Sequence, residues 1–86
     1  MYQKDVVLYT RSRSLRCWRA RRLLQHRGYQ FEVVDTTNAP EALDRLLHRK
    51  TALPYVFVDH RPVGDFGIIK ALDRSGTLER LVRHEI

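Results

Sequence analysis

The stretch DVVLYTRSRSLRCWRARRLL, from Asp5 to Leu24, decides the fold that we expect for this chain. It begins with the apolar run VVLY, which has the composition of a strand, and then passes through a polar turn. Beyond the turn, positions 17, 20 and 24 lie on one face of a helix, and Gly28 is a suitable left-handed stop residue. The stretch therefore predicts a strand followed by a helix over about residues 15–27.

The rest of the chain alternates between segments typical of strands and of helices. Runs rich in β-branched and aromatic residues predict three more strands, over residues 29–36, 54–58 and 61–63. Apolar stripes at helical spacing predict three more helices, over residues 38–50, 66–72 and 77–86. Asn38 is the expected N-cap of the first of these helices, with Pro40 in its first turn. Asp59–His60 suits a tight turn between strands, and the DRSG segment at 73–76 separates the last two helices.

The predicted elements follow in the order β-α-β-α-β-β-α-α. A parallel pair of strands needs a right-handed helical crossover, and the later hairpin adds antiparallel strands. We therefore expect an α/β fold in which a four-stranded mixed sheet carries helices on both faces. The length of 86 residues is that of a single domain, covering residues 1–86.

Composition excludes several classes of protein. With 43% apolar and 30% charged residues, the chain is typical of an ordinary soluble globular protein. It has one cysteine, so it has no internal disulfide, and no apolar run approaches the roughly 20 residues that cross a bilayer. The first residues also lack the pattern of a signal peptide. We therefore expect a cytoplasmic protein without membrane contact.

The net charge of +6 raises the question of an anionic partner. Arginine supplies thirteen of the sixteen basic residues, which fits either a coding bias toward arginine or a basic binding surface. Nucleic acid is the less favoured partner because the aromatic residues are not interleaved with the basic ones. The four histidines are scattered without the spacing of metal ligands, so we expect no metal site.

Four motifs, taken in order, are similar to those of the glutaredoxin family, which has the thioredoxin fold. VVLYT before a loop and a helix resembles the start of a glutaredoxin, and LPYVFV resembles the family's Thr-Val-Pro segment. VGDFG stands where a Gly-Gly motif is usual, and SGTLERL resembles the closing helix. The resemblance implies a redox protein that uses glutathione as co-substrate and acts on disulfide-containing proteins or small-molecule mixed disulfides. We expect it to be a monomer.

The family's Cys-Pro-Tyr-Cys box falls on Ser14, Leu15, Arg16 and Cys17. Ser14 thus takes the place of the family's nucleophilic cysteine, and Cys17 takes that of the resolving cysteine. A serine hydroxyl cannot form a disulfide and stays protonated at neutral pH without a base beside it. We therefore interpret Ser14 as the N-cap of the helix. A cysteine deliberately replaced by serine is the alternative.

Two interpretations of Cys17 remain open from the residues alone. It shares an apolar helix face with Ala20 and Leu24, where a cysteine is often a small buried side chain with an inert thiol. It also lies within about one turn of the helix start. The positive end of the helix dipole and the nearby Arg11, Arg13 and Arg16 would stabilise a thiolate or an anionic ligand there.

The resemblance assigns further residues to glutathione. Arg11 replaces a lysine of the family and Arg16 replaces the tyrosine of the box, so both would steer the carboxylates of glutathione. Leu53 and Pro54 match the end of the Thr-Val-Pro segment. In the family that proline is cis and lies against the active-site cysteines, and the backbone before it orients the bound peptide.

The far end of glutathione falls, by the same resemblance, on the backbone of Gly64, Asp65 and Phe66. Gly64 matches the first glycine of the family's motif, while Asp65 replaces the second. Gly67 and Ile68 stand where acidic residues are usual in the family.

Two hypotheses of function follow. In the first, the protein is a glutaredoxin-like thiol–disulfide oxidoreductase of an atypical single-cysteine form, in which Cys17 attacks a mixed disulfide and glutathione resolves it. In the second, the protein is a redox-inactive binding module on the same fold. Its Arg-rich helix N-terminus would then bind an anionic partner, which is an acidic protein, a small anion or nucleic acid.

Overall fold

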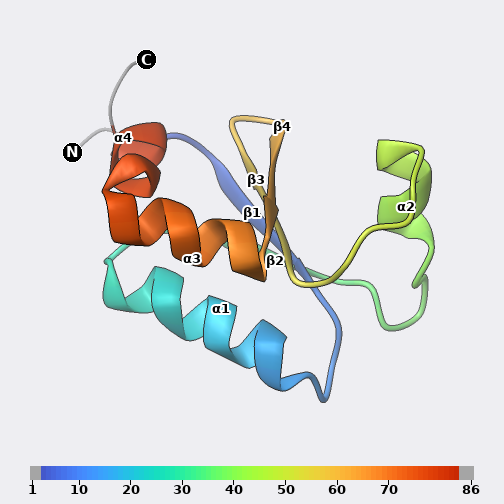
Figure 1. The fold of residues 1–86 in the computed structure, drawn as a ribbon. Coiled ribbons are helices and arrows are strands. Elements are labelled where there is room, and N and C mark those ends of the chain that lie inside the picture. Colours follow the sequence, from blue (N-terminus) through green and yellow to red (C-terminus); the bar gives the residue numbers. More distant parts are fainter. Residues whose placement is uncertain (1–2, 84–86) are drawn as a thin grey trace.

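A computed structural model describes residues 3–83 of the chain. The elements follow in the predicted order (Figure 1). They are β1 (Val6–Thr10), α1 (Leu15–His26), β2 (Glu32–Asp35), α2 (Ala42–Leu47), β3 (Tyr55–Val58), β4 (Arg61–Asp65), α3 (Phe66–Ser75) and α4 (Thr77–Arg83). The last predicted helix extends to residue 86, and its positions 84–86 lie outside the described residues.

The four strands form one mixed sheet in the order β2-β1-β3-β4. β1 runs parallel to β2, with Leu8 opposite Val33, and the α1 crossover joins the two strands. β1 and β3 are antiparallel, as are β3 and β4, whose pairing is irregular between Val56 and Phe57. Because β1 and β2 are parallel, their carboxyl ends lie at the same end of the sheet, beside the N-terminus of α1 (Figure 1).

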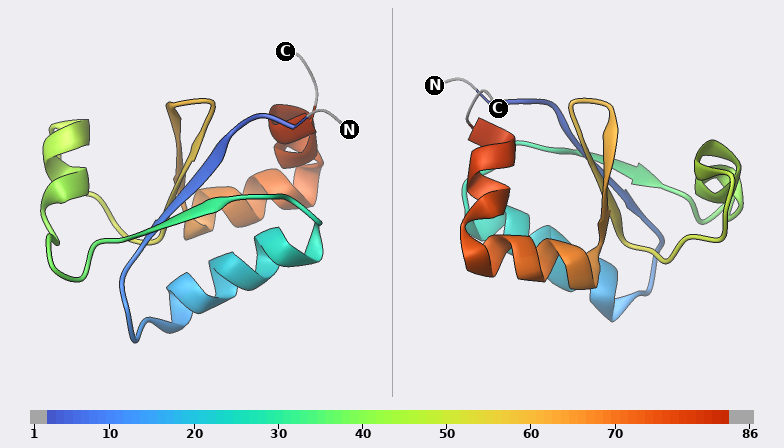
Figure 2. Two further views of the ribbon diagram at one scale, coloured as in Figure 1. Left: turned by 180° about the vertical axis from the view of Figure 1, so that it is seen from behind. Right: turned by 45° about the horizontal axis from the view of Figure 1, so that its top comes forward.

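Alternating side chains of the central strands divide the core between the two faces of the sheet. Val6 and Leu8 of β1 pack with buried residues of α1, α3 and α4. On the other face, Leu43 of α2 packs with Tyr55 and Phe57 of β3. Figure 2 shows α2 on the opposite side of the sheet from the other three helices. The predicted mixed sheet with helices on both faces is therefore confirmed.

The second helix is shorter than predicted. It begins after Glu41, so Asn38 is not its N-cap and Pro40 lies before its first turn. The segment forms turns instead, in which the Ala39 N–H donates to the Thr36 carbonyl at 3.0 Å and the Ala42 N–H donates to the Ala39 carbonyl at 3.0 Å. Residue 39 precedes a proline, and this position disfavours helical backbone.

The other boundaries differ by a few residues. β2 omits Tyr29, which is buried and donates its hydroxyl hydrogen to Glu79 of α4 at 3.0 Å. α3 continues through Asp73 to Ser75, so only Gly76 separates α3 from α4. Its φ of 81° is a left-handed conformation that favours glycine. No helix within residues 3–83 has the length and apolar character needed to span a bilayer.

Candidate functional site

The N-terminus of α1 is fixed by Ser14. This residue has an extended backbone, its Oγ accepts a hydrogen bond from the Cys17 N–H at 3.3 Å, and its carbonyl accepts one from the Trp18 N–H at 3.0 Å. Such a side chain satisfies one of the N–H groups that the first turn of a helix leaves unpaired. The interpretation of Ser14 as an N-cap is confirmed.

The loop before α1 is held against the end of β2. The Ser12 N–H donates to Thr37 Oγ1 at 3.0 Å, and the two hydroxyl oxygens lie 3.0 Å apart. Thr37 in turn donates its hydroxyl hydrogen and its N–H to Asp35 Oδ1. These two hydrogen bonds, the hydroxyl first, lower the pKa of the Asp35 carboxyl from its usual value. Asp35 therefore stays ionised at neutral pH, at the end of β2 beside this loop.

Cys17 is buried in the first turn of α1. It is 4% exposed and belongs to the same helix face as Ala20 and Leu24, both of which are also buried. This is the position that the packed-side-chain interpretation predicted. The residue nevertheless forms part of the wall of a groove, and it belongs to neither of the two core clusters.

This groove, which we call the Cys17 groove, has a volume of about 270 Å³. The charged residues of its lining are three arginines and one aspartate, Arg11, Arg13, Arg21 and Asp35. Ser14, Cys17 and Trp18 contribute the part of its wall that α1 supplies. The excess of positive charge makes this a place for an anionic ligand.

A second groove continues from the first. It has a volume of about 530 Å³ and is lined in part by Thr37, Pro40 and Leu53. Arg11 and Ser12 line both grooves, so a ligand lying along them would pass from Cys17 to Leu53 over these two residues. The structure thus brings Arg11, Ser14, Cys17 and Leu53 of the predicted site to two adjoining grooves.

Pro54 follows Leu53 at the start of β3 and is buried. The Leu53–Pro54 peptide bond is cis, as the resemblance implied.

The other predicted contacts form the junction between β4 and α3. Gly64 is buried, and a Cβ added to it would lie 2.6 Å from Ile68 Cγ2. Asp65 is the N-cap of α3 and accepts a hydrogen bond from the Ile68 N–H at 3.2 Å, while Phe66 is buried. The guanidinium of Arg16 lies over the Phe66 ring, 5.9 Å from its centroid. Arg16 therefore lies at this junction, and neither it nor the junction lines the two grooves.

Sequence reasoning missed two charged groups of the Cys17 groove. Arg21 is four residues after Cys17, a spacing that places both on neighbouring turns of one helix and could have revealed it. Asp35 ends β2, and it is close only because β2 pairs in parallel with β1. Within residues 3–83, no group of three His, Cys, Asp or Glu side chains is placed to hold a metal ion.

The fold and the site together define a class of protein. Solved glutaredoxin structures superimpose closely on this chain. The glutaredoxin of Brucella melitensis gives a TM-score of 0.81 at 28% identity, covering 94% of this chain and 90% of that one. A buckwheat glutaredoxin–glutathione complex gives 0.80 at 16% identity, covering 92% and 76%. The chain therefore has the thioredoxin-like fold of the glutaredoxins.

Sequence similarity identifies the family. Residues 6–63 match the Glutaredoxin family profile. A glutaredoxin of Pseudomonas aeruginosa is 32% identical over 79 residues, covering 90% of this chain and 94% of that protein. Glutaredoxin-C1 of Oryza sativa is 34% identical over 88 residues, covering 95% and 85%. The chain belongs to the glutaredoxin family, and its predicted assignment to that family is confirmed.

Proposed function

We propose that this glutaredoxin-like redox protein carries out glutathione-linked thiol–disulfide exchange with Cys17 as its single reactive thiol. The observation that carries the proposal is the position of Cys17 in the wall of a groove lined by Arg11, Arg13 and Arg21. A packed cysteine of the core would have no such groove and no such charge beside it. The exchange makes the chain an enzyme of the atypical single-cysteine form.

The electrostatics of the groove fit this ligand. Glutathione carries two carboxylates and one ammonium group at neutral pH, and the residues that line the groove include three arginines and Asp35. The same positive charges attract the carboxylates of an incoming glutathione toward Cys17. Leu53 lines the adjoining groove, where we propose that its backbone orients the peptide beside Pro54.

The reaction has two balanced steps. The Cys17 thiolate attacks the glutathione sulfur of a mixed disulfide, which forms a Cys17–glutathione disulfide and releases the substrate thiolate. A second glutathione thiolate then attacks the bound glutathione sulfur. Oxidised glutathione leaves, and the Cys17 thiolate is regenerated. Substrate is reduced and glutathione is oxidised, so no second cysteine in the chain is needed.

Ser14 occupies the place of the family's nucleophile, and we assign it a positioning role. Its hydroxyl holds the Cys17 N–H and thereby the first turn of the helix. Gly64, Asp65 and Phe66 stay proposed contacts for the far end of glutathione, with Arg16 at the same junction. We place this reaction in the cytoplasm, where thiols are kept reduced, and propose that the protein acts as a monomer.

A second function is favoured by the burial of the thiol. Cys17 is 4% exposed, so a disulfide reaches it only when the side chains that line the groove move apart. Without such opening, the arginine-lined groove would bind an anionic partner and no exchange would occur. The protein would then be a redox-inactive binding module.

One experiment separates the two functions. The native protein is incubated with oxidised glutathione, and its intact mass is measured, with Cys17→Ala as the control. We expect the native chain to gain one glutathione, located at Cys17 by peptide mapping, and the variant to gain none. If the mass changes only in denaturant, the thiol is competent but closed off in the fold, and the binding module is the correct function.

A further inference from the structure

The side of α1 that faces away from the core carries two large exposed apolar residues. Leu15 and Trp18 are 61% and 55% exposed, and their spacing of three residues puts them on one side of the helix. The buried residues Cys17, Ala20 and Leu24 occupy the opposite side. Packing within the fold therefore does not account for the exposure of Leu15 and Trp18. We call the surface formed by Leu15, Trp18, Arg19 and Arg22 the outer face of α1.

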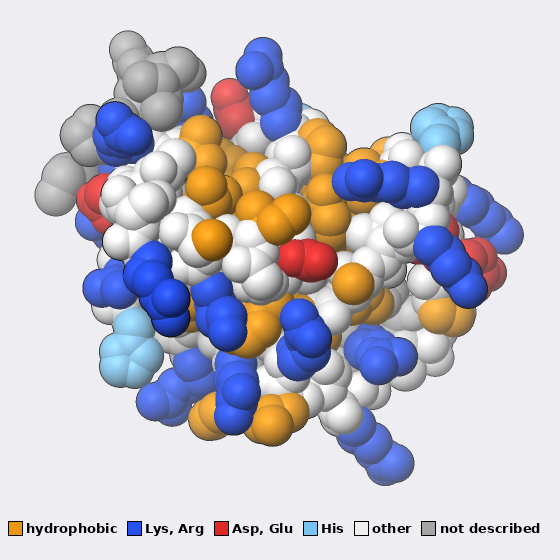
Figure 3. All heavy atoms as spheres, viewed as in Figure 1, with side chains coloured by type: hydrophobic (Ala, Val, Ile, Leu, Met, Phe, Trp, Pro, Cys, Tyr) orange, Lys and Arg blue, Asp and Glu red, His pale blue; other side chains and the backbone are white. Residues whose placement is uncertain are grey.

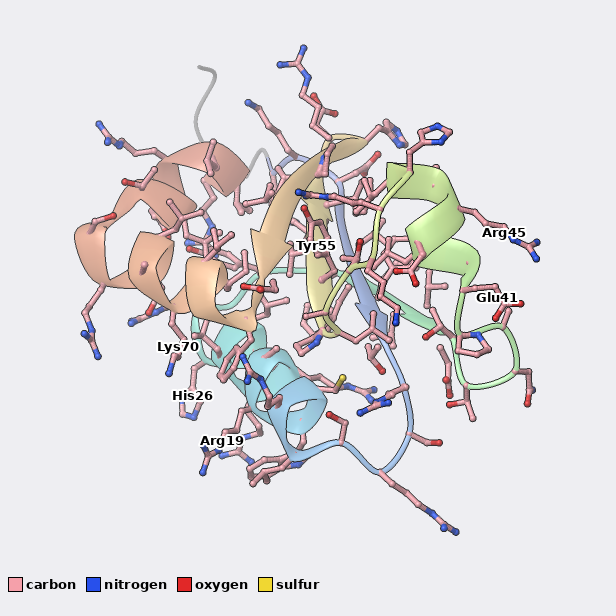
Figure 4. The ribbon with its side chains drawn as sticks, turned by 45° about the vertical axis from the view of Figure 1, so that its right-hand side comes forward. Arg19, His26, Glu41, Arg45, Tyr55 and Lys70 are labelled. Atoms are coloured by element: carbon pink, nitrogen blue, oxygen red, sulfur yellow. The ribbon has the colours of Figure 1, made fainter. Side chains whose placement is uncertain are left out.

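Positive charge surrounds these two residues. The 12 residues of α1 include four arginines, at positions 16, 19, 21 and 22, and no Asp or Glu. None of the four makes an ion pair with a carboxylate of residues 3–83. Figure 3 shows Lys and Arg side chains crowding the part of the surface formed by α1 and α3, with apolar atoms exposed among them. Figure 4 shows Arg19 pointing away from the body of the protein.

Arg22 and Trp18 form a preorganised pair on this face. The Arg22 guanidinium lies 5.4 Å from the centroid of the Trp18 ring, within the range of a cation–π contact. A hollow of about 290 Å³ lies among Trp18, Arg21, Arg22 and Gln25. Two guanidinium groups beside an indole can receive carboxylate side chains together with a short apolar stem. Tryptophan and arginine are also the residue types that dominate binding energy at protein interfaces.

The hollow adjoins the Cys17 groove. Trp18 and Arg21 line both of them. A partner bound to the outer face of α1 would therefore lie next to the groove that Cys17 lines. The docking surface and the groove of Cys17 are neighbours on the protein.

We infer that the outer face of α1 binds acidic protein segments and so selects disulfide substrates whose cysteine is flanked by acidic residues. The selection of substrates rests on the proposed function, whereas the docking does not. In the selected reaction, the Cys17 thiolate attacks the glutathione sulfur of the acid-flanked mixed disulfide. That disulfide breaks, and the substrate leaves as a thiolate, which takes a proton from water.

The chemistry of the face favours an acidic protein over other anions. Single-stranded nucleic acid stacks its bases on successive aromatic side chains, and α1 presents Trp18 alone, with Arg22 over its ring. A membrane surface needs a broad apolar face, and only Leu15 and Trp18 are exposed apolar residues of α1. A second copy of the chain is disfavoured because each copy carries a net charge of +6.

The docking is tested with the Cys17→Ala variant, so that no exchange contributes. Trp18 is the only tryptophan of the chain, and its fluorescence reports binding at the face directly. The probe is a short synthetic peptide that alternates Glu with Leu. We expect a saturable change in emission, which Arg19→Glu with Arg22→Glu weakens by about tenfold or more and high salt weakens as well.

A matched control carries the same change of charge elsewhere. Arg61→Glu with Arg80→Glu, on β4 and α4, should change the affinity by no more than about twofold. Equal losses in both double variants would show that net charge and not the outer face is responsible, and would overturn the inference. Tighter binding of a thymidine oligonucleotide or of anionic lipid vesicles than of the Glu-Leu peptide would overturn it too.

The selection of substrates is tested with three peptides that carry glutathione on one cysteine, flanked by Glu, Gln or Lys. We expect the native protein to release thiol fastest from the Glu peptide, and Arg19→Glu with Arg22→Glu to reverse this order. Equal rates for the three peptides would overturn the selection while leaving the proposed function intact. If no peptide and no oxidised glutathione reacts, the proposed function fails, and the fluorescence titration still decides the docking.

Discussion

At the scale of single residues, one hydrogen bond joins Ser14 to Cys17. Ser14 Oγ accepts from the Cys17 N–H, so the hydroxyl supports the helix turn that carries the thiol. Arg13, directly before Ser14, has a φ of 60°, a left-handed conformation that costs a non-glycine residue about 1 kcal/mol or more. The chain accepts this cost at the turn that directs it from β1 into α1.

Replacing Ser14 tests its capping role. Ser14→Ala removes the acceptor for the Cys17 N–H and should lower the free energy of unfolding by about 1 kcal/mol. Ser14→Asp keeps an acceptor and adds negative charge at the positive end of the helix, so it should retain the stability of the original chain. Urea unfolding measures both, and equal losses in the two variants would contradict the cap.

At the scale of elements, the β4–α3 junction leaves no room for a side chain at Gly64. A Cβ there would lie 2.6 Å from Ile68 Cγ2 and 2.7 Å from Ile68 Cβ, so the main body of Ile68 would have to move. Gly67 is different, because its nearest neighbour, Asp65 Oδ1, would be 3.5 Å from an added Cβ.

These two glycines give a matched pair of variants. Gly64→Ala should lower the free energy of unfolding by about 1–3 kcal/mol because it overpacks the junction. Gly67→Ala lies in an exposed helical position and should raise stability by up to about 1 kcal/mol. Denaturant titrations of both variants check the difference, and a destabilised Gly67→Ala would show that the junction is tight throughout.

The hairpin between β3 and β4 turns over two left-handed residues, Asp59 with a φ of 55° and His60 with a φ of 66°. Such two-residue turns favour glycine at the second position. His60→Gly should therefore raise the free energy of unfolding by up to about 1 kcal/mol, and His60→Ala should not. Thermal unfolding of the two variants distinguishes this effect from the loss of the exposed His60 side chain itself.

At the scale of the whole molecule, the end of α1 is joined to the last helix. Arg83 of α4 donates to the carbonyls of Arg27 and Gly28 at 3.0 and 3.2 Å. Arg27 is the C-cap of α1, and the last carbonyls of a helix have no partner within it. The Arg83 guanidinium also lies 5.0 Å from the centroid of the Tyr29 ring. The C-terminal helix thus holds the helix that carries the site.

Because of Tyr29, the free energy of unfolding falls at alkaline pH. Burial, followed by the hydrogen bond to Glu79 and the charge of that carboxylate, raises the pKa of Tyr29 from 10.0 to about 12. The folded chain therefore keeps a proton that the unfolded chain loses above pH 10. The free energy contributed by Tyr29 is complete below pH 10 and is lost as the pH rises toward about 12.

This dependence is measured by urea unfolding at a series of alkaline pH values. Tyr29→Phe cannot release a proton, so the fall in unfolding free energy should be shallower in this variant than in the original chain. Parallel curves for the two proteins would show that another group titrates in this range.

The sequence by itself determined the order of elements, the mixed sheet and the capping role of Ser14. These follow from local patterns: apolar spacing, turn residues and the preference of serine for helix starts. It also placed Cys17 on a buried helix face and close to arginines. It could not decide whether Cys17 is a buried side chain with an inert thiol or part of a site for a thiolate or an anionic ligand. The predicted helix ends near Asn38 and Asp73 were wrong. The segment after Asn38 forms turn hydrogen bonds instead of a helix, and α3 continues past Asp73 to Ser75.

Only the tertiary structure decided which charges meet. Parallel pairing of β1 and β2 brings Asp35 to the groove of Cys17, 18 positions away in the sequence. The packing of α1 against α3 takes Arg16 to the Phe66 ring and leaves Arg11 in both grooves. Contacts between distant segments depend on how whole elements pack, and spacing along the chain carries no direct record of that packing.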